Sequence, residues 1–219
     1  MPKARLQAAL ALLPTRGRIA DAGAGDGLLA RMLVARTQGV EVIATEPARG
    51  AFSRLAAACA GEERIQVRFG AGLAPLRGER LDAVAILGMG AHTILSILED
   101  AAEHPETLFV LGPMQHVPAL REGLVHRGLA ISHERLAVEG GRAYEVIAAR
   151  RAPSSPLDFL DAQLGPFLRA AHPPGFDLVC RQRLRVLRGR LAGSTDAERE
   201  TLLRHILQIE QEYDGPRNA

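Results

Sequence analysis

The chain has 219 residues, 47% of them hydrophobic, which suffices for one α/β domain with a sizeable core and a small appended region. It contains no apolar run long enough to predict a membrane-spanning helix, and its first residues carry no signal-like segment. The net charge of +2 does not by itself indicate a nucleic-acid partner, and the arginine-rich composition also fits GC-rich coding. Cys59 and Cys180 fit no metal or redox spacing, so we expect a metal-free cytoplasmic protein with reduced thiols.

Short apolar strands alternate with helical stretches over the first part of the chain. Strands are predicted at 17–23, 40–47, 65–72, 81–90 and 107–113. Helices are predicted at 28–38, 51–61, 93–104 and 117–128. This alternation predicts a parallel sheet with helices packed on it. The run at 81–90 is apolar almost throughout, as is typical of a strand that is buried on both faces.

The pattern changes after residue 128. Residues 129–151 read as two strands around the turn "EGGR", which predicts an antiparallel hairpin. Such a hairpin at the end of a parallel sheet is the layout of class I methyltransferases, whereas a dinucleotide-binding fold would continue with parallel units. We therefore predict an α/β fold with a Rossmann-like methyltransferase sheet that an antiparallel hairpin closes.

A second, helical region is predicted beyond a linker. The stretch "APSSP" at 152–156 is a linker signal, and helices are predicted at 156–172, 176–193 and 195–213. Thr195 and Glu198 form a capping box at the start of the last helix. The predicted organisation is a methyltransferase domain at 1–151 and a helical, coiled-coil-like hairpin at 157–219.

The stretch "DAGAGDG" at 21–27 follows the first predicted strand. A dinucleotide fingerprint would need a third glycine at Leu28, whereas the pattern D-x-G-x-G-x-G is typical of S-adenosylmethionine sites. Gly23, Gly25 and Gly27 would let the backbone approach the methionine part of that cofactor. Asp21 can orient its amino-acid end. The alternative interpretation is a tight turn without a ligand.

Glu46 ends the second predicted strand, in "IATEP". A carboxylate at this place can accept hydrogen bonds from both ribose hydroxyls of an adenosyl group. The alternative is a surface glutamate at a strand end. Together with Asp21 and the glycines, Glu46 predicts a site for S-adenosylmethionine.

Several motifs resemble one family almost from end to end. They are "RLQAAL", "IADAG", "ILGMGAHTI", "EGGRAYEVIAAR" and "LGPFL". With "GMG", "YEV" and "GPFL" as its specific parts, this combination resembles the bacterial tRNA (adenine-22-N1)-methyltransferases. The resemblance implies S-adenosylmethionine as cofactor, tRNA as partner and methyl transfer to N1 of an adenine in the D-arm. It also implies a Rossmann-like domain followed by a helical one, and we expect a monomer or weak dimer.

The chain departs from that family's pattern at several strand ends. Gly25 and Asp26 replace an aspartate and a histidine, Ala71 replaces an acid near the cofactor's adenine, and Gly112 replaces a glutamine. Two alternatives therefore stay open. One is a methyltransferase that acts on another substrate, and the other is an RNA-binding relative that no longer catalyses.

Substrate contacts are predicted at two places. The loop Gly88–Met89–Gly90, with Gly88 toward the cofactor, and Pro113 would border the base pocket. Met89 would press on the purine or fill the core. No catalytic residue is assigned, because N1 of neutral adenine has a lone pair and needs alignment rather than a strong base. Tyr144 lies in a predicted hairpin strand, where aromatic residues are favoured, and is interpreted as structural; the alternative is that it stacks on a base.

The second place at which substrate contacts are predicted is the densest basic run, "RQRLRVLRGR". Arg181, Arg185 and Arg188 fall on one helical face and could grip phosphates. The alternative is a solvated face that pairs with acids such as Asp177.

Overall fold

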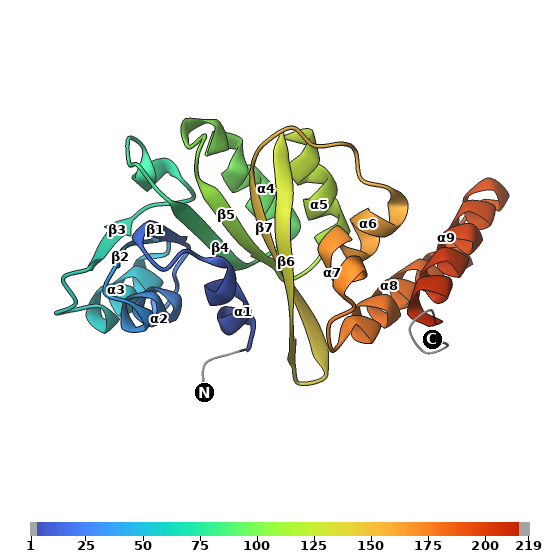
Figure 1. Cartoon of the computed structure of the whole chain (residues 1–219), viewed down its shortest axis with the longest axis horizontal. Helices are drawn as coiled ribbons and strands as arrows, with labels where there is room; N and C mark the ends of the chain where they lie inside the picture. The colour runs from blue at the N-terminus through green and yellow to red at the C-terminus, as the bar shows by residue number, and fades with distance from the viewer. Residues whose placement is uncertain (1–3, 215–219) are drawn as a thin grey trace.

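The computed structural model describes residues 4–214, so residues 1–3 and 215–219, the outer ends of the two predicted domains, lie outside the described residues. Its centre is a seven-stranded sheet of order β3-β2-β1-β4-β5-β7-β6 (Figure 1). The first five strands pair in parallel, and β7 and β6 add an antiparallel hairpin. The strands are β1 (Gly17–Ala22), β2 (Val40–Glu46), β3 (Ile65–Phe69), β4 (Ala83–Met89), β5 (Leu108–Pro113), β6 (Leu129–Glu139) and β7 (Arg142–Arg151). The predicted fold class is confirmed.

Helices cover both faces of the sheet. One core lies under α1 (Ala4–Leu12), α2 (Leu28–Arg36) and α3 (Arg49–Ala58). The other lies under α4 (Ala91–Ile97) and α5 (Val117–His126), with the short turns η1 (Ala74–Leu76) and η2 (Leu98–Glu103). The first four residues of β4 are completely buried, as the apolar run predicts for a strand covered on both faces. The helix predicted at 93–104 begins earlier, at Ala91, and tightens into η2.

The region beyond the linker is helical. It comprises α6 (Phe159–Leu164), α7 (Pro166–Ala171), α8 (Phe176–Arg190), η3 (Leu191–Gly193) and α9 (Asp196–Asp214). We call residues 159–214 the appendage. The prediction of one helix over 156–172 is wrong, because Gly165 adopts a φ of 89° and Pro166 starts a new helix. Glu198 accepts the backbone N–H of Thr195 over 2.9 Å, which is the Glu198 half of the predicted capping box, and the Thr195 hydroxyl donates to the same carboxylate.

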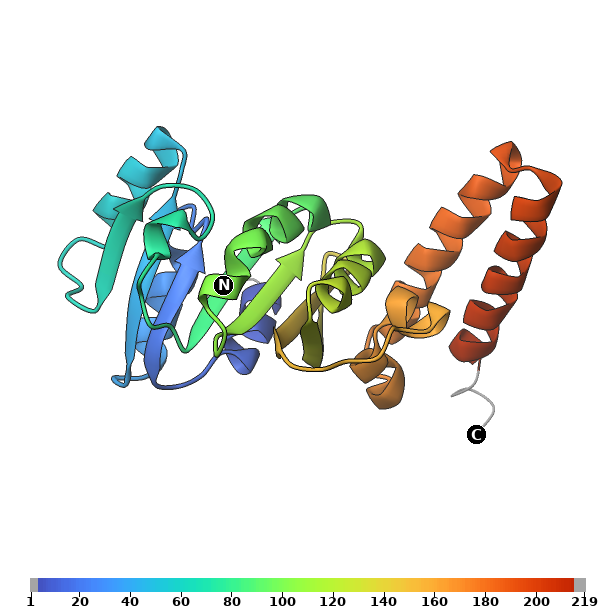
Figure 2. The same ribbon diagram turned by 90° about the horizontal axis from the view of Figure 1, so that it is seen from above.

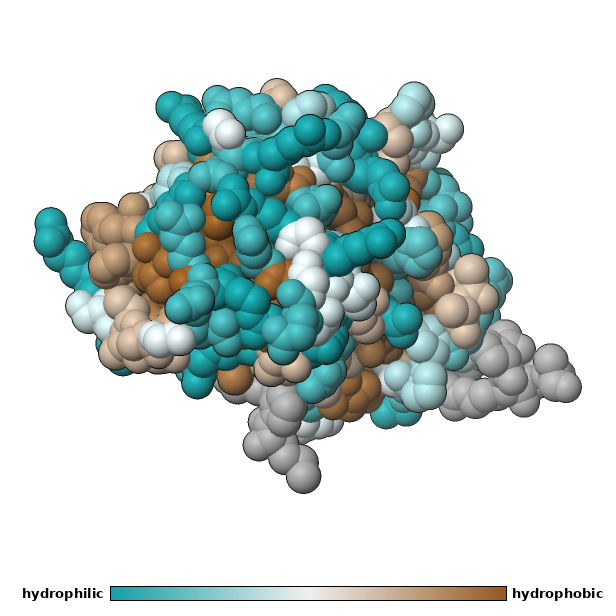
Figure 3. Space-filling view, turned by 60° about the vertical axis from the view of Figure 1, so that its left-hand side comes forward, coloured by the Kyte–Doolittle hydropathy of each residue, from teal (hydrophilic) through white to brown (hydrophobic). Residues whose placement is uncertain are grey.

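The appendage projects from the β6–β7 end of the sheet. Figure 2 shows α8 and α9 side by side, leading away from the sheet. Their apolar residues form a third core, which also includes Ala143 of β7 and contacts Leu136 of β6. The opposite end of the molecule carries β3. Figure 3 brings that end forward and shows apolar surface between hydrophilic side chains. Phe69, the last residue of β3, is 49% exposed there.

Candidate functional site

The glycine turn lies where the order of the strands reverses, because β1 pairs with β2 on one side and β4 on the other. Ligands of open α/β sheets bind at the carboxyl ends of the strands at this point. Gly23, Gly25 and Gly27 have φ values of 77°, 61° and 73°, a conformation that side chains rarely adopt. A Cβ on Gly23 would lie 2.2 Å from Cε of Met89, so this glycine allows close packing. A Cβ on Gly25 would meet nothing within 4 Å, so the turn leaves open space there.

The end of β2 holds the turn in place. The carbonyl oxygen of Thr45 accepts the N–H groups of Gly23 and Ala24, each over 2.9 Å. Glu46 is 8% exposed, and its two carboxylate oxygens accept the N–H groups of Gly25 (3.1 Å) and Ala48 (3.0 Å). Each oxygen has more than one lone pair, so the carboxylate can accept further donors. Glu46 therefore lies beside the turn with capacity left for hydroxyl groups.

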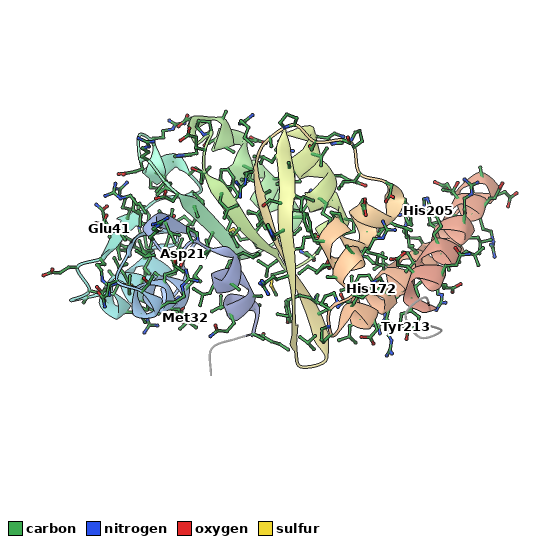
Figure 4. All side chains as sticks on the ribbon, viewed as in Figure 1. Asp21, Met32, Glu41, His172, His205 and Tyr213 are labelled. Carbon is green, nitrogen blue, oxygen red and sulfur yellow. The ribbon has the colours of Figure 1, made fainter. Side chains whose placement is uncertain are left out.

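Asp21 is a buried acid at the end of β1, next to α2 (Figure 4). Within residues 4–214 its Oδ2 has no hydrogen-bond partner, and neither has Oγ1 of the neighbouring Thr45. The pKa of Asp21 is raised to about 7, chiefly because the side chain is buried; a hydrogen bond from the Ala30 amide opposes this rise, and the charges of Asp26 and Glu46 add to it. Such a carboxylate fits a ligand group that is positively charged and donates hydrogen bonds.

The other two predicted cofactor residues lie along the same edge. Ala71 follows β3 and is exposed, with no side-chain acceptor. Gly88, near the end of β4, has a φ of 79° and open space where a Cβ would be. The structure thus brings all seven predicted cofactor residues to the carboxyl ends of β1 to β4. Open glycines, the Glu46 carboxylate and the unpartnered Asp21 oxygen fit an adenosyl group that carries an amino acid.

A hollow lies beside Gly88. Its lining comes from α1, the ends of β4 and β5, and the middle of β7: Arg5, Leu6, Leu87, Gly88, Gly112, Pro113, Met114, Tyr144, Glu145 and Val146. The guanidinium groups of Arg5 and Arg142 lie 5.6 and 5.7 Å from the ring centroid of Tyr144. Of the predicted substrate residues, Pro113 lines this hollow. Arg5 was not singled out from the sequence, because no spacing in the chain links α1 to β7. Tyr144 was interpreted as structural because aromatic residues are favoured in strands.

The rest of the predicted loop packs around this edge. The contact of Met89 with Gly23 supports the interpretation of Met89 as a packing residue. Gly90 is the residue before α4. His92 and His116, which the sequence analysis did not single out, follow β4 and β5 and are exposed, with ring centroids 5.6 Å apart. They are distant in sequence and meet only through the parallel sheet.

The three predicted phosphate-gripping arginines lie elsewhere, on α8. All three are exposed, as the helical spacing predicts. Arg181 pairs with Asp177 at 3.2 Å and donates to Tyr213, and Arg188 pairs with Glu210. Arg185 has no ion pair within the described part of the chain. Acids thus accompany two of the three arginines, and the structure does not bring the face to the cofactor edge.

No helix within residues 4–214 is long and apolar enough to cross a membrane. No three or more His, Cys, Asp and Glu side chains in that range gather in a way that could hold a metal ion. Cys59 and Cys180 are both buried free thiols.

The reversed strand order, the glycine turn, the acid that ends β2 and the closing hairpin define a class I methyltransferase. The sequence model of the "Methyltransferase domain" family matches residues 2–147, and the chain belongs to this family.

The chain is similar to particular members of this class. The tRNA (adenine(22)-N(1))-methyltransferase of Bacillus subtilis (strain 168) is 32% identical over 151 residues, which are 66% of this chain and 63% of that protein. The crystal structure of Streptococcus pneumoniae Sp1610, a candidate tRNA (m1A22) methyltransferase, matches with a TM-score of 0.86 and 26% identity, over 97% of this chain and 100% of that one. Its complex with S-adenosyl-L-methionine matches equally, at 25% identity.

Proposed function

We propose that this protein is an S-adenosylmethionine-dependent tRNA methyltransferase that transfers a methyl group to N1 of an adenine in the D-arm. The observation that carries the proposal is the match to Sp1610, which extends over 97% of this chain and so includes the appendage. General methyltransferase relatives match over less of it: a ribosomal protein L11 methylase matches over 68%, at a TM-score of 0.55.

The carboxyl edge of β1 to β4 would hold the cofactor. Glu46 would accept hydrogen bonds from the ribose hydroxyls, and Asp21 would accept from the ammonium group. Gly25 and Gly88 would admit the ligand to the backbone, where the structure leaves open space. Ala71 would border the adenine without accepting its amino group. The bound sulfonium supplies an electrophilic methyl group.

The hollow beside Gly88 marks where the reacting base would enter once it is extruded from its stack, and it would have to widen for that, because its free volume of about 20 Å³ is room for about one water molecule. Its mainly apolar exposed lining would exclude water, and a base that displaced the guanidinium group of Arg5 or Arg142 would stack on the ring of Tyr144. Neutral adenine carries its lone pair on N1, so the task of Gly88, Met89, Gly90 and Pro113 is to align that atom. Alignment alone can supply a large share of a rate acceleration.

The appendage would bind the RNA. Its own core supports our division of the chain into a methyltransferase domain at 1–151 and a helical domain at 157–219. Arg181, Arg185 and Arg188 would contact phosphates. Arg181 and Arg188 would each replace the ion pair with an acid by an ion pair with a phosphate. We also propose that the protein is cytoplasmic and that it is a monomer or a weak dimer.

A specific observation keeps one alternative open, namely a methyltransferase for another substrate. Gly112 lines the hollow where the resembled family has glutamine, so no amide comes from that position, and the nearby Gln115 side chain lies beside Gly90 instead. A catalytically inactive RNA-binding relative is the remaining alternative.

The experiment that tests the proposal is transfer of labelled methyl from S-adenosylmethionine to unmodified tRNA, followed by mass spectrometry of the nucleosides. We expect N1-methyladenosine at one position of the D-arm. Cofactor binding without transfer to any tRNA would overturn the proposal and favour the alternatives. The Glu46→Ala variant serves as a control for transfer that does not depend on this site.

A further inference from the structure

A buried network of four charged side chains joins the appendage to the wall of the hollow. Arg121 of α5 is completely buried between Glu134 of β6 and Glu145 of β7, at 2.7 and 2.6 Å. The other oxygen of Glu145 accepts from Arg183 of α8 at 2.5 Å. We call Arg121, Glu134, Glu145 and Arg183 the ionic joint; its two acids and two cations balance in charge.

The ionic joint also fixes the short helices of the appendage. Arg121 donates to the carbonyl oxygens of Ala162 (3.2 Å) and Gln163 (3.4 Å) at the end of α6. Arg183 donates to that of Gln163 over 2.8 Å. Glu134 accepts the N–H groups of Phe167 (3.0 Å) and Leu168 (3.4 Å) at the start of α7. Three helices of the appendage thus attach at one point.

Two motifs that pointed to the family meet in this network. "YEV" contributes Glu145 to the network. "GPFL" contributes Gly165, whose missing side chain leaves room for the network. A Cβ on Gly165 would lie 2.4 Å from Oε2 of Glu134 and 2.5 Å from Nη2 of Arg121. Glu145 itself lines the hollow, next to Tyr144. Because successive side chains of a strand alternate between its faces, the Glu145 carboxylate lies on the face opposite Tyr144 and Val146, and the ionic joint ties the appendage to the strand whose other face forms the wall of the hollow.

Directed hydrogen bonds specify an orientation more sharply than apolar packing, which tolerates small slides. Buried ion pairs seldom add net stability over well-packed apolar groups, and their best-attested use is to fix geometry. We propose that Arg183 and Glu145 are positioning residues that hold the appendage at one orientation to the hollow. An RNA gripped by the appendage then presents one adenine to the hollow rather than its neighbours. This inference rests on the proposed function.

The test compares Arg183→Met, which keeps the aliphatic stem and removes the charge, with Arg80→Met. Arg80 is a control because it makes an ion pair with Glu106 although its side chain is 97% exposed. For Arg183→Met we expect a kcat for tRNA methylation that is lower by about tenfold or more, since a misplacement of 1 Å can cost on the order of 100-fold. The Kd values for S-adenosylmethionine and tRNA should change less than kcat. Arg183→Lys should recover part of kcat, and Arg80→Met should match the wild type.

A second readout does not depend on activity. Spin labels on Ser53→Cys in α3 and Leu203→Cys in α9, both exposed positions, report the distance between the two regions by pulsed electron resonance, while the native thiols are buried. We expect one narrow distance distribution with Arg183 and a broader or shifted one with Arg183→Met. If Arg183→Met does not fold, Arg183→Lys is compared with the wild type by the same readouts, with a smaller change expected.

Unchanged kcat together with an unchanged distance distribution would overturn the inference, and so would a loss of thermal stability alone. If the wild type methylates no tRNA, the proposed function fails, but the distance distributions still decide whether the ionic joint fixes the orientation.

Discussion

Asp21 combines a proposed role in cofactor binding with a cost in stability. Burial raises its pKa to about 7 from an ordinary 3.8, so between these values the folded state holds a proton that the unfolded chain has lost. As the pH rises from about 4 to 7, Asp21 therefore lowers the free energy of unfolding by about 1.4 kcal/mol per pH unit. Asp21→Asn removes this contribution. We expect the variant to be the more stable protein above pH 7 and to lose that advantage toward pH 4, as measured by urea unfolding at pH 5 and pH 8.

The same substitution should weaken cofactor binding, because the amide has no negative charge for the ammonium group. A stabilising change that costs function is typical of a binding site. If the stability difference between variant and wild type is equal at pH 5 and pH 8, the raised pKa of Asp21 is wrong. Asp196→Asn is the control, because that side chain is exposed and lies in α9, in the appendage.

Glu46 gives a second prediction for a single residue. Its carboxylate accepts two backbone N–H groups and is proposed to bind the ribose, so Glu46→Ala should abolish or strongly weaken S-adenosylmethionine binding. The loss of a charged acceptor leaves two hydroxyls of the ligand unpaired. Isothermal titration calorimetry measures the effect. Unchanged affinity would remove Glu46 from the ribose site, and Glu41→Ala on the exposed side of β2 is the matched control.

The face of α8 is tested as an element. Replacing Arg181, Arg185 and Arg188 together by glutamine should lower tRNA affinity and flatten its dependence on salt, by roughly one unit of log–log slope for each phosphate that is no longer bound. Filter binding at several salt concentrations measures this slope. A control with the same change in charge replaces three exposed arginines elsewhere: Arg54, Arg77 and Arg80. If both triple variants keep the wild-type slope, the α8 face does not bind the RNA.

The whole molecule should respond to its cofactor. A ligand that binds only the folded chain at 100 times its Kd adds about 2.7 kcal/mol to the free energy of unfolding. For a chain of this length that corresponds to a rise in Tm of roughly 5 to 10 °C. Differential scanning calorimetry with S-adenosylmethionine should show the rise for the wild type. A similar rise for Glu46→Ala would mean that the cofactor binds elsewhere.

The order of strands and helices could be predicted from the sequence, because the spacing of apolar residues and the positions of glycines at turns are local properties. The glycine turn and Glu46 were predictable for the same reason, since each directly follows or ends a strand and parallel strands bring such ends to one edge. The division of 156–172 into α6 and α7 was missed, although Gly165 and Pro166 were visible. Their signal was ambiguous, because proline is also tolerated inside the first turn of a helix.

By itself the sequence determined the fold class and the cofactor edge, because both depend on local pattern and strand order. Only the tertiary structure decided which arginines of α8 are exposed and which one is tied to the sheet. Helical spacing groups Arg181, Arg185 and Arg188 on one face, but it does not tell which face meets the sheet. Arg183, between them in the chain, reaches the buried Glu145. The ionic joint and the hollow are formed by residues from elements that are distant in the chain. Such residues meet only when helices and strands pack against one another, and local sequence patterns do not encode that packing.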